Sequence, residues 1–430
     1  MIQTGLIQSA HDDLVTDISY DFYGLRLATC SLDQRIKVWQ LDESNGTWSV
    51  EDEWKAHDAA VSRLSWAHPE FGTILASASF DRTVKIWEQT SFVSAGDVQL
   101  NGSTPVQQVS GSGSSSRWAE RAVLVDARGT VRAVEFAPHH FGLKLATISS
   151  DNQLRIYECL EQSSLATWQL SEEVDVTTLP SMSSPSSHSV AFATPTQTSA
   201  TLDGASASLV AQALQQSQVP FQPRPGMGNR EADGGWCISW CKERYWGEVV
   251  AAGCGISGTI KVIQVSPSRR PTTLLTLDPT PTGALRLTEG SVGAAPSSEN
   301  EAPTPYAITS VAWAPSCGRS YHLIATGGRD GHVRIWRVKP AEDTDDTEGE
   351  GEPKWTGTIV ADFDHHKSAV GRVEWNITGT VLSSAGNDGR VRLWKATIGN
   401  VWRPAGSIGV EQSEDSPDAD ATMEDNTGAD

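Results

Sequence analysis

The stretch that decides the fold runs from His57 to Trp87 and reads HDAAVSRLSWAHPEFGTILASASFDRTVKIW. Three short strands joined by tight turns are predicted in it. VSRLSW and TVKIW alternate apolar with polar residues, and ILASAS between them is small and apolar. His57, Ser77, Asp81 and Trp87 punctuate the stretch, with Ser four residues before Asp and Trp six residues after it.

The same four-residue pattern occurs twice more in the chain. In each case a Ser or Thr precedes the Asp by four residues and a Trp follows it by six. The two further sets are His11, Thr29, Asp33, Trp39 and His366, Ser384, Asp388, Trp394. Three matches to one template indicate WD-type repeats, each a four-stranded blade of a β-propeller. The fold class predicted is therefore all-β, a WD-repeat β-propeller.

The chemistry of the four residues favours a structural network. An Asp in the turn between two strands accepts bonds from backbone N–H groups, and the hydroxyl and imidazole link it to the donor-only indole of Trp. His, Ser and Asp also form nucleophilic triads. A triad is needed only once, whereas this set appears three times, so we interpret these twelve residues as structural tetrads. No catalytic residue, cofactor site or metal site is predicted.

An enzyme that uses the central channel of a propeller would carry convergent acids and bases on its inner strands. These segments read ISYD, LSWAH, VEFAP, CISWC, VAWAP and VEWN, and only His68 and Glu374 stand out. We interpret His68 as shaping a turn before Pro69. The inner-strand residues Trp66, Trp240, Trp313 and Trp375 are expected to pack between blades. A scaffold is therefore favoured over an enzyme.

The net charge of −20 is concentrated in two segments. Residues 341–353 carry seven acids and residues 411–430 carry eight, and neither segment has a base. No basic stripe is present, so direct binding of nucleic acid is not expected. No apolar run is long enough to insert in a membrane, and the first residues lack the pattern of a signal peptide. The six Cys form no CxxC pair, which is typical of reduced thiols.

Six blades are expected along residues 1–410. Three of the six depart from the template: Tyr157 replaces Trp in the third, Ser257 replaces Asp in the fourth, and the fifth lacks His. The blades are placed at about 11–56, 57–125, 127–176, 233–277, 305–364 and 365–409. Flexible inserts are expected at about 91–116, 178–232, 278–304 and 341–353, and an acidic disordered tail at 411–430.

The count of six leaves the closure of the ring undecided. Residues 400–409 supply an outer strand for the sixth blade, and residues 2–7 form a spare strand at the N-terminus. A closed ring and an open ring are both consistent with this pattern. In an open ring the first and last blades present edges that a partner's strands can pair with. The residues expected at this edge are Ile2, Leu6, Ile7, Leu14, Val15 and Val370.

Three segments of the chain resemble the Seh-type WD-repeat nucleoporin, a relative of the Sec-thirteen coat protein. They are HDDLVTDISYDFYGLRLATCSLDQRIKVW, WAHPEFGTILASASFDRTVKIWE and LVDARGTVRAVEFAPHHFGLKLATISSDNQLRIYE. The resemblance implies an open six-bladed propeller, completed in trans by a β-blade from a large α-helical nucleoporin. The runner-up is a Sec-thirteen-type subunit of the COPII vesicle coat.

The same resemblance implies a function and a location. The chain is expected to be a non-catalytic scaffold subunit of the Y-shaped outer-ring subcomplex of the nuclear pore, with other Y-complex nucleoporins as partners. It would support nucleocytoplasmic transport of protein and mRNA at the nuclear envelope. A second role in the SEA/GATOR nutrient-signalling complex would place it at the vacuolar or lysosomal membrane surface as well.

Overall fold

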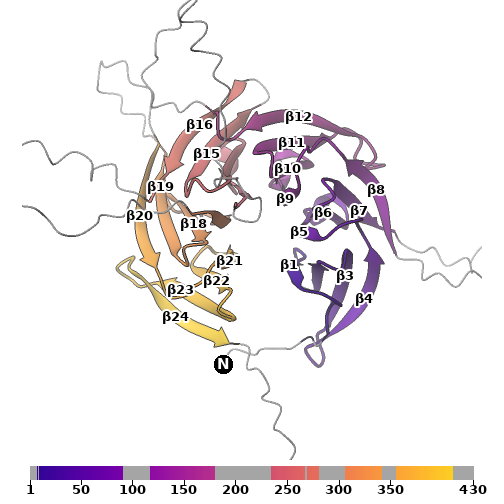
Figure 1. Ribbon diagram of the computed structural model, residues 1–430, viewed down its shortest axis with the longest axis horizontal. Helices are drawn as coiled ribbons and strands as arrows, with labels where there is room; N and C mark the ends of the chain where they lie inside the picture. Colours follow the sequence, from indigo (N-terminus) through magenta and orange to yellow (C-terminus); the bar gives the residue numbers. More distant parts are fainter. Residues whose placement is uncertain are drawn as a thin grey trace, which may run out of the picture.

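The computed structural model describes residues 7, 9–90, 117–179, 234–266, 269–279, 306–340 and 355–409. The strands of these residues form six four-stranded antiparallel sheets, arranged around a ring as the blades of a propeller (Figure 1). The same residues contain short 3₁₀ turns and no α-helix, and none of their helices is long and apolar enough to cross a membrane. The fold is therefore the six-bladed β-propeller predicted from the repeats.

Each blade is built from four consecutive strands, ordered along the sequence from the ring axis outward. Blade one contains β1 (Val15–Tyr20), β2 (Arg26–Ser31), β3 (Arg35–Asp42) and β4 (Thr47–Lys55). Blade two contains β5 (Val61–Trp66), β6 (Ile74–Ser79), β7 (Val84–Gln89) and β8 (Trp118–Leu124). Blade three contains β9 (Val131–Phe136), β10 (Lys144–Ser149), β11 (Gln153–Cys159) and β12 (Trp168–Asp175).

The second half of the chain repeats the arrangement. Blade four contains β13 (Cys237–Trp240), β14 (Val249–Gly253), β15 (Ile260–Ser266) and β16 (Arg269–Leu277). Blade five contains β17 (Ile308–Trp313), β18 (His322–Gly328), β19 (Val333–Lys339) and β20 (Thr356–Phe363). Blade six contains β21 (Val370–Trp375), β22 (Val381–Gly386), β23 (Arg390–Ala396) and β24 (Trp402–Gly409).

The middle strands explain why small apolar residues dominate the repeats. All six residues of β6 and all six of β10 are buried, because each of these strands lies between two neighbouring blades. A strand covered on both faces reads as a continuous apolar run, whereas the outer strand β4 is mostly exposed and reads as mixed. The hydrophobic core is accordingly a series of clusters between blades.

A β-bulge interrupts the pairing of the first two strands in most blades. In blades one, two, three, five and six it skips one residue of the first strand: Thr16, Ser62, Arg132, Thr309 and Gly371. A bulge residue turns its side chain away from the ladder, toward the next blade. In blades one, two and five the bulge therefore places a hydroxyl at the interface with the following blade.

The inserts, the tail and the N-terminal strand predicted from the sequence lie mainly in residues that the structure does not describe. The predicted inserts at 91–116, 178–232, 278–304 and 341–353 lie almost wholly outside the described residues, as do the tail at 411–430 and the strand at 2–7. His68 lies where the sequence suggested: it precedes the 3₁₀ turn Pro69–Phe71, and its Nδ1 accepts a hydrogen bond from the Glu70 N–H at 3.2 Å.

Candidate functional site

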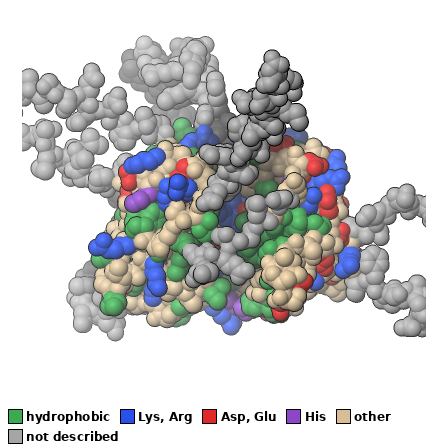
Figure 2. Space-filling model, turned by 90° about the horizontal axis from the view of Figure 1, so that it is seen from below, with side chains coloured by type: hydrophobic (Ala, Val, Ile, Leu, Met, Phe, Trp, Pro, Cys, Tyr) green, Lys and Arg blue, Asp and Glu red, His purple; other side chains and the backbone are tan. Residues whose placement is uncertain are grey.

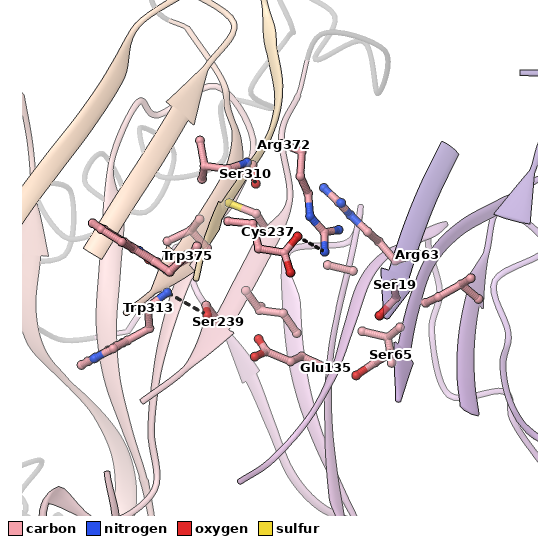
Figure 3. Close-up of a pocket in the computed structure, with 18 of the residues that line it drawn as sticks. Ser19, Arg63, Ser65, Glu135, Cys237, Ser239, Ser310, Trp313, Arg372 and Trp375 are labelled. Atoms are coloured by element: carbon pink, nitrogen blue, oxygen red, sulfur yellow. Dashed lines mark hydrogen bonds and ion pairs between the residues drawn. The ribbon is translucent and has the colours of Figure 1, made fainter. Parts of the chain in front are cut away.

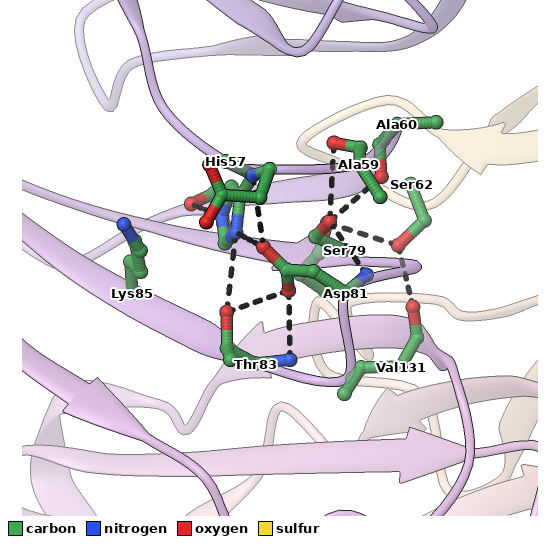
Figure 4. Close-up of polar contacts among 12 residues, drawn as sticks. His57, Ala59, Ala60, Ser62, Ser79, Asp81, Thr83, Lys85 and Val131 are labelled. Atoms are coloured by element: carbon green, nitrogen blue, oxygen red, sulfur yellow. Dashed lines mark hydrogen bonds and ion pairs between the residues drawn. The ribbon is translucent and has the colours of Figure 1, made fainter.

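The tetrad of blade two forms a continuous hydrogen-bonded chain, and Figure 4 shows its end at His57 and Asp81. The Trp87 indole N–H donates to the Ser77 hydroxyl at 2.9 Å, and that oxygen lies 2.7 Å from Nε2 of His57. Nδ1 of His57 lies 2.8 Å from the Asp81 carboxylate. With the imidazole proton on Nδ1, each of these groups donates to the next one along. The network buries the indole with its polar atom satisfied.

Blades one and six repeat this chain. His11 lies 2.8 Å from both Asp33 and Thr29, and Trp39 donates to Thr29 at 2.9 Å. In blade six the three corresponding distances are 3.0, 2.8 and 2.8 Å, for His366–Asp388, His366–Ser384 and Trp394–Ser384. The hydrogen bonds of all three tetrads are thus made within single blades, while the tetrad Trp rings of blades two and six also pack on the preceding blade, Trp87 on Trp54 and Trp394 on Phe363.

The carboxylates of these networks are held in the charged form. Partial burial raises the pKa of Asp81, but its bonds with His57 and Thr83 lower it more, and the net pKa lies well below the usual range. Burial raises the pKa of Asp388 as well, whereas His366 and Arg392 bring it down to about 2. A carboxylate that is hydrogen-bonded and paired in this way acts as a structural acceptor rather than a proton donor.

Blades three and five lack the His and use Arg in its place, a substitution that the sequence pattern did not reveal. Arg155 of β11 is fully buried and donates to Asp151 at 2.8 Å and to Ser149 at 2.7 Å. Arg334 of β19 lies 2.8 Å from Asp330 in the same way. Arg155 and Arg334 occupy the same strand position, opposite the Thr of the repeat. In these two blades the Arg takes over the contact with the Asp that His makes elsewhere, whereas blade six has both His366 and Arg392.

Neighbouring blades are joined by a repeated set of hydrogen bonds. The bulge hydroxyls of Thr16 and Ser62 donate to the Val61 and Val131 carbonyls of the next blade at 2.5 and 2.7 Å, and Thr309 does the same toward Val370. In the opposite direction, the indoles of Trp66, Trp240 and Trp375 donate to the preceding blade, to the carbonyls of Ser19, Glu135 and Ala312 at 3.0, 3.1 and 3.0 Å. These inner-strand Trp residues therefore lie between blades, as expected.

Blades six and one do not make such an interface. In every other neighbouring pair the inner strand of one blade packs along the inner strand of the next, whereas β21 and β1 have no comparable packing and touch through Arg372 and Asp17. Figure 1 shows the resulting gap between β21–β24 and β1–β4. The ring is therefore open among the described residues.

The flank of the gap on blade one consists of apolar residues that are buried in every other blade. Ile18 of β1 is 50% exposed. The residues at the same position of the other inner strands are only 2–7% exposed: Leu64, Val134, Ile238, Val311 and Val373. Tyr20 is likewise exposed where the other blades carry a buried or half-buried Trp or Phe. Blade one therefore keeps the apolar surface that normally meets a preceding blade.

The flank on blade six belongs to β23. Val391 is 37% exposed and Leu393 is half-buried, both on the side facing the gap. Their equivalents in the other blades are all buried: Ile36, Val38, Val84, Ile86, Leu154, Ile156, Ile260, Val262, Val333 and Ile335. Figure 2, which views the ring from the side of the gap, shows hydrophobic side chains at the surface of both ends.

The residues predicted for this edge lie in different places, and one of them, Val370, lies away from the gap. Leu14 and Val15 are exposed at the free side of blade one. Val370 is fully buried and packs on Gly327 of blade five, because the apolar residues of an inner strand face the preceding blade. Ile7 is half-buried and lies outside any strand, and Ile2 and Leu6 lie outside the described residues. Ile18, Val391 and Leu393 are gap residues that the prediction missed.

The central cavity does not resemble an active site. It has a volume of about 380 Å³, and its charged lining residues pair with one another (Figure 3). Lys242 forms an ion pair with Glu135, and Arg372 lies 3.6 Å from Glu374. Among the described residues, no group of three or more His, Cys, Asp or Glu side chains is arranged to hold a metal ion. The gap is accordingly the candidate functional site.

One family model matches four segments of the chain. The family model described as "WD domain, G-beta repeat" matches residues 4–40, 48–88, 301–337 and 357–395. Among solved structures, the chain is similar to Chaetomium thermophilum Sqt1 bound to the N-terminus of ribosomal protein L10, with a TM-score of 0.49 and 16% identity over 93% of this chain and 76% of the other. We infer nothing further from a likeness at that level.

Curated relatives are similar over nearly the whole chain. Nucleoporin SEH1 of Saccharomyces cerevisiae is 32% identical over 94% of this chain and 99% of its own length. Nucleoporin SEH1 of Homo sapiens is 34% identical over 94% of this chain and 87% of its own. The chain therefore belongs to the SEH1 family of WD-repeat nucleoporins.

Proposed function

We propose that this nuclear pore scaffold protein binds a partner that inserts a β-blade into the gap between blades six and one. The observation that carries the proposal is the matched exposure of the two flanks: Ile18 on β1, and Val391 and Leu393 on β23. Each position is buried in the five other blades. Since isolated apolar residues at a surface are common but two facing rows are not, the flanks are best explained as halves of a missing blade–blade interface.

The shape of the gap defines the chemistry of the partner. Its strands would have to present apolar side chains toward Ile18 on one face and toward Val391 on the other. Burial of these residues would contribute roughly 25 cal/mol per Å² of apolar surface. A partner chain seated in this way completes the ring without any change in the six blades, which fits a non-catalytic scaffold.

The identity of the partner follows from the family and not from the geometry. Because the relatives are named nucleoporins, we propose a large α-helical nucleoporin of the Y-shaped outer-ring complex as the blade donor. The protein would thereby support transport of protein and mRNA through the pore. The SEA/GATOR complex is proposed as a second setting in which the same gap is used.

Affinity isolation of the tagged chain from cells tests the partner assignment. We expect outer-ring nucleoporins in stoichiometric amounts, with SEA/GATOR subunits as a second set. Recovery of COPII coat components in place of nucleoporins would contradict the proposal and support the Sec-thirteen-type alternative.

A substitution on the flank tests the gap itself. Ile18→Glu places a charge on a surface that a partner's strands must bury, so we expect loss of the nucleoporins from the isolate. Val15→Glu should have the same effect. Val125→Glu is the matched control, because Val125 is also an exposed apolar residue but lies outside the gap, after β8. Equal recovery of partners with Ile18→Glu and Val125→Glu would refute binding at the gap.

A further inference from the structure

A buried carboxylate joins blades one and six at the ring axis. Asp17 of β1 has a side chain that is only 2% exposed. It accepts hydrogen bonds from two residues of blade two, the Leu64 N–H at 2.9 Å and the Arg63 guanidinium at 3.1 Å. On its other side it accepts a hydrogen bond from the Arg372 guanidinium of blade six. Two residues separated by 355 positions in the chain are thus in direct contact.

The three charged residues occupy one position of the repeat. Asp17, Arg63 and Arg372 each follow the bulge residue of an inner strand, in blades one, two and six. Figure 3 shows the side chains of Arg63 and Arg372 pointing toward each other at the central cavity. The two arginines therefore approach the same carboxylate from the two sides of blade one.

The residue at this position in blade five serves an ordinary interface. Ser310 accepts a hydrogen bond from the Val373 N–H of the following blade at 3.1 Å. A guanidinium carries donors only, so Arg372 cannot accept such a bond. It pairs with carboxylates instead: Glu374 of its own strand lies 3.6 Å away, and Asp17 of blade one, on the far side of the gap, accepts a hydrogen bond from it.

We propose that Asp17 and Arg372 form a clasp that fixes the width of the gap at the ring axis. The clasp holds the inner strands of blades six and one at a set spacing, while β4 and β24 stay apart at the rim. Hydrogen bonds between a guanidinium and a buried carboxylate are stronger than those between neutral groups. Removal of the Arg372 guanidinium would leave the buried Asp17 carboxylate with one charged partner fewer. The width of the gap is a property of the free chain and is measurable without any partner.

Pulsed electron paramagnetic resonance across the gap tests the clasp. Nitroxide labels would be attached at Ser49→Cys on β4 and Ser407→Cys on β24, both exposed positions. Of the six native cysteines only Cys317 is exposed, so the labelled chain would carry Cys317→Ser. We expect Arg372→Met to give a longer and broader distance distribution than the parent chain. Arg372→Lys, which keeps a donor of the same charge, should restore most of the parent distribution.

Two control variants separate the clasp from a general loss of stability. Arg63→Met removes a bond to the same carboxylate on the side of blade two, and should leave the distance across the gap unchanged. Arg334→Met breaks ion pairs of similar burial inside blade five, and should lower the melting temperature without widening the gap. An unchanged distribution in Arg372→Met, or equal broadening in all three Met variants, would overturn the clasp.

These outcomes are independent of the proposed function. Failure of the clasp would leave the partner-binding test with Ile18→Glu unaffected. Conversely, a chain that binds no nucleoporin would still show the effect of Arg372→Met on the distance.

Discussion

Two kinds of boundary occur in this ring: five interfaces between successive blades, and the gap between blades six and one. At the five interfaces an apolar inner-strand residue faces the preceding blade and is almost completely buried. At the gap the same position, Ile18, is half exposed, and the bulge residue that would donate to a seventh blade is Gly371. Blade one therefore keeps the apolar face with which a blade packs on the preceding blade. Blade six, in contrast, lacks the bulge hydroxyl that Thr16, Ser62 and Thr309 donate to the following blade.

This asymmetry has a consequence for recognition. A partner's strands meet an ordinary propeller interface on the side of blade one, with Ile18 and Tyr20 in the places of buried residues. On the side of blade six they meet the exposed face of β23, with no hydroxyl at the bulge to accept or donate. The side of blade one should therefore contribute most of the specificity of the complex.

The largest effect is expected from a pair of aromatic residues at the same inner-strand position. Trp240 is fully buried between blades three and four and donates to the Glu135 carbonyl. Trp240→Ala should lower the free energy of unfolding by about 3–5 kcal/mol, because it leaves a large cavity. Tyr20→Ala on the open flank should cost the free chain less than about 1 kcal/mol. Denaturant unfolding followed by Trp fluorescence and circular dichroism measures both.

The two variants also test whether the flank of blade one differs from a closed blade–blade interface. If Tyr20→Ala destabilises the free chain as much as Trp240→Ala, then the flank of blade one is already covered in solution. The gap would in that case be closed by the chain itself, and no partner surface would remain at Ile18.

The tetrad contacts within each blade could be predicted from the sequence, whereas the side of a strand that meets the neighbouring blade could not. The tetrads are contacts within one blade, and their fixed spacing predicts both the repeats and the partners of Asp81. The position of Val370 depends on whether the apolar side of an inner strand faces the preceding or the following blade. The alternation of apolar and polar residues is the same in both cases, so the sequence does not decide between them. Arg155 was missed for another reason: a basic residue in a β-strand reads as exposed, whereas this one is buried and paired with Asp151 and Glu173 of its own blade.

A smaller effect is expected for the tetrad carboxylates, which stabilise each blade from within. Asp81→Ala leaves backbone N–H groups of the turn unpaired and releases His57, and should cost about 1–3 kcal/mol. Asp33→Ala and Asp388→Ala should behave in the same way. Ser257 of blade four has no such network, since its hydroxyl donates to the Cys254 carbonyl at 3.2 Å, and Ser257→Ala should change stability by less than about 0.5 kcal/mol. Equal melting shifts for all four variants would contradict a structural role of the tetrads.

The smallest effect concerns the bulge residue, where the closed and open boundaries differ by a single hydroxyl. Thr309→Val removes the bond from blade five to the Val370 carbonyl and should cost about 1 kcal/mol, a typical net value for one hydrogen bond. Gly371→Ser adds the hydroxyl to blade six, where a new Cβ meets only the Ala385 carbonyl at 3.8 Å. With no following blade to bind, the added hydroxyl should not stabilise the free chain, and its melting temperature should stay within the error of the parent.

In the isolated complex the same hydroxyl faces the inserted strands, so Gly371→Ser should change the affinity for the partner, in either direction, while leaving the stability of the free chain unchanged. A shift in the melting temperature of the free chain would show that the bulge of blade six already meets a following blade, and would contradict the gap between blades six and one.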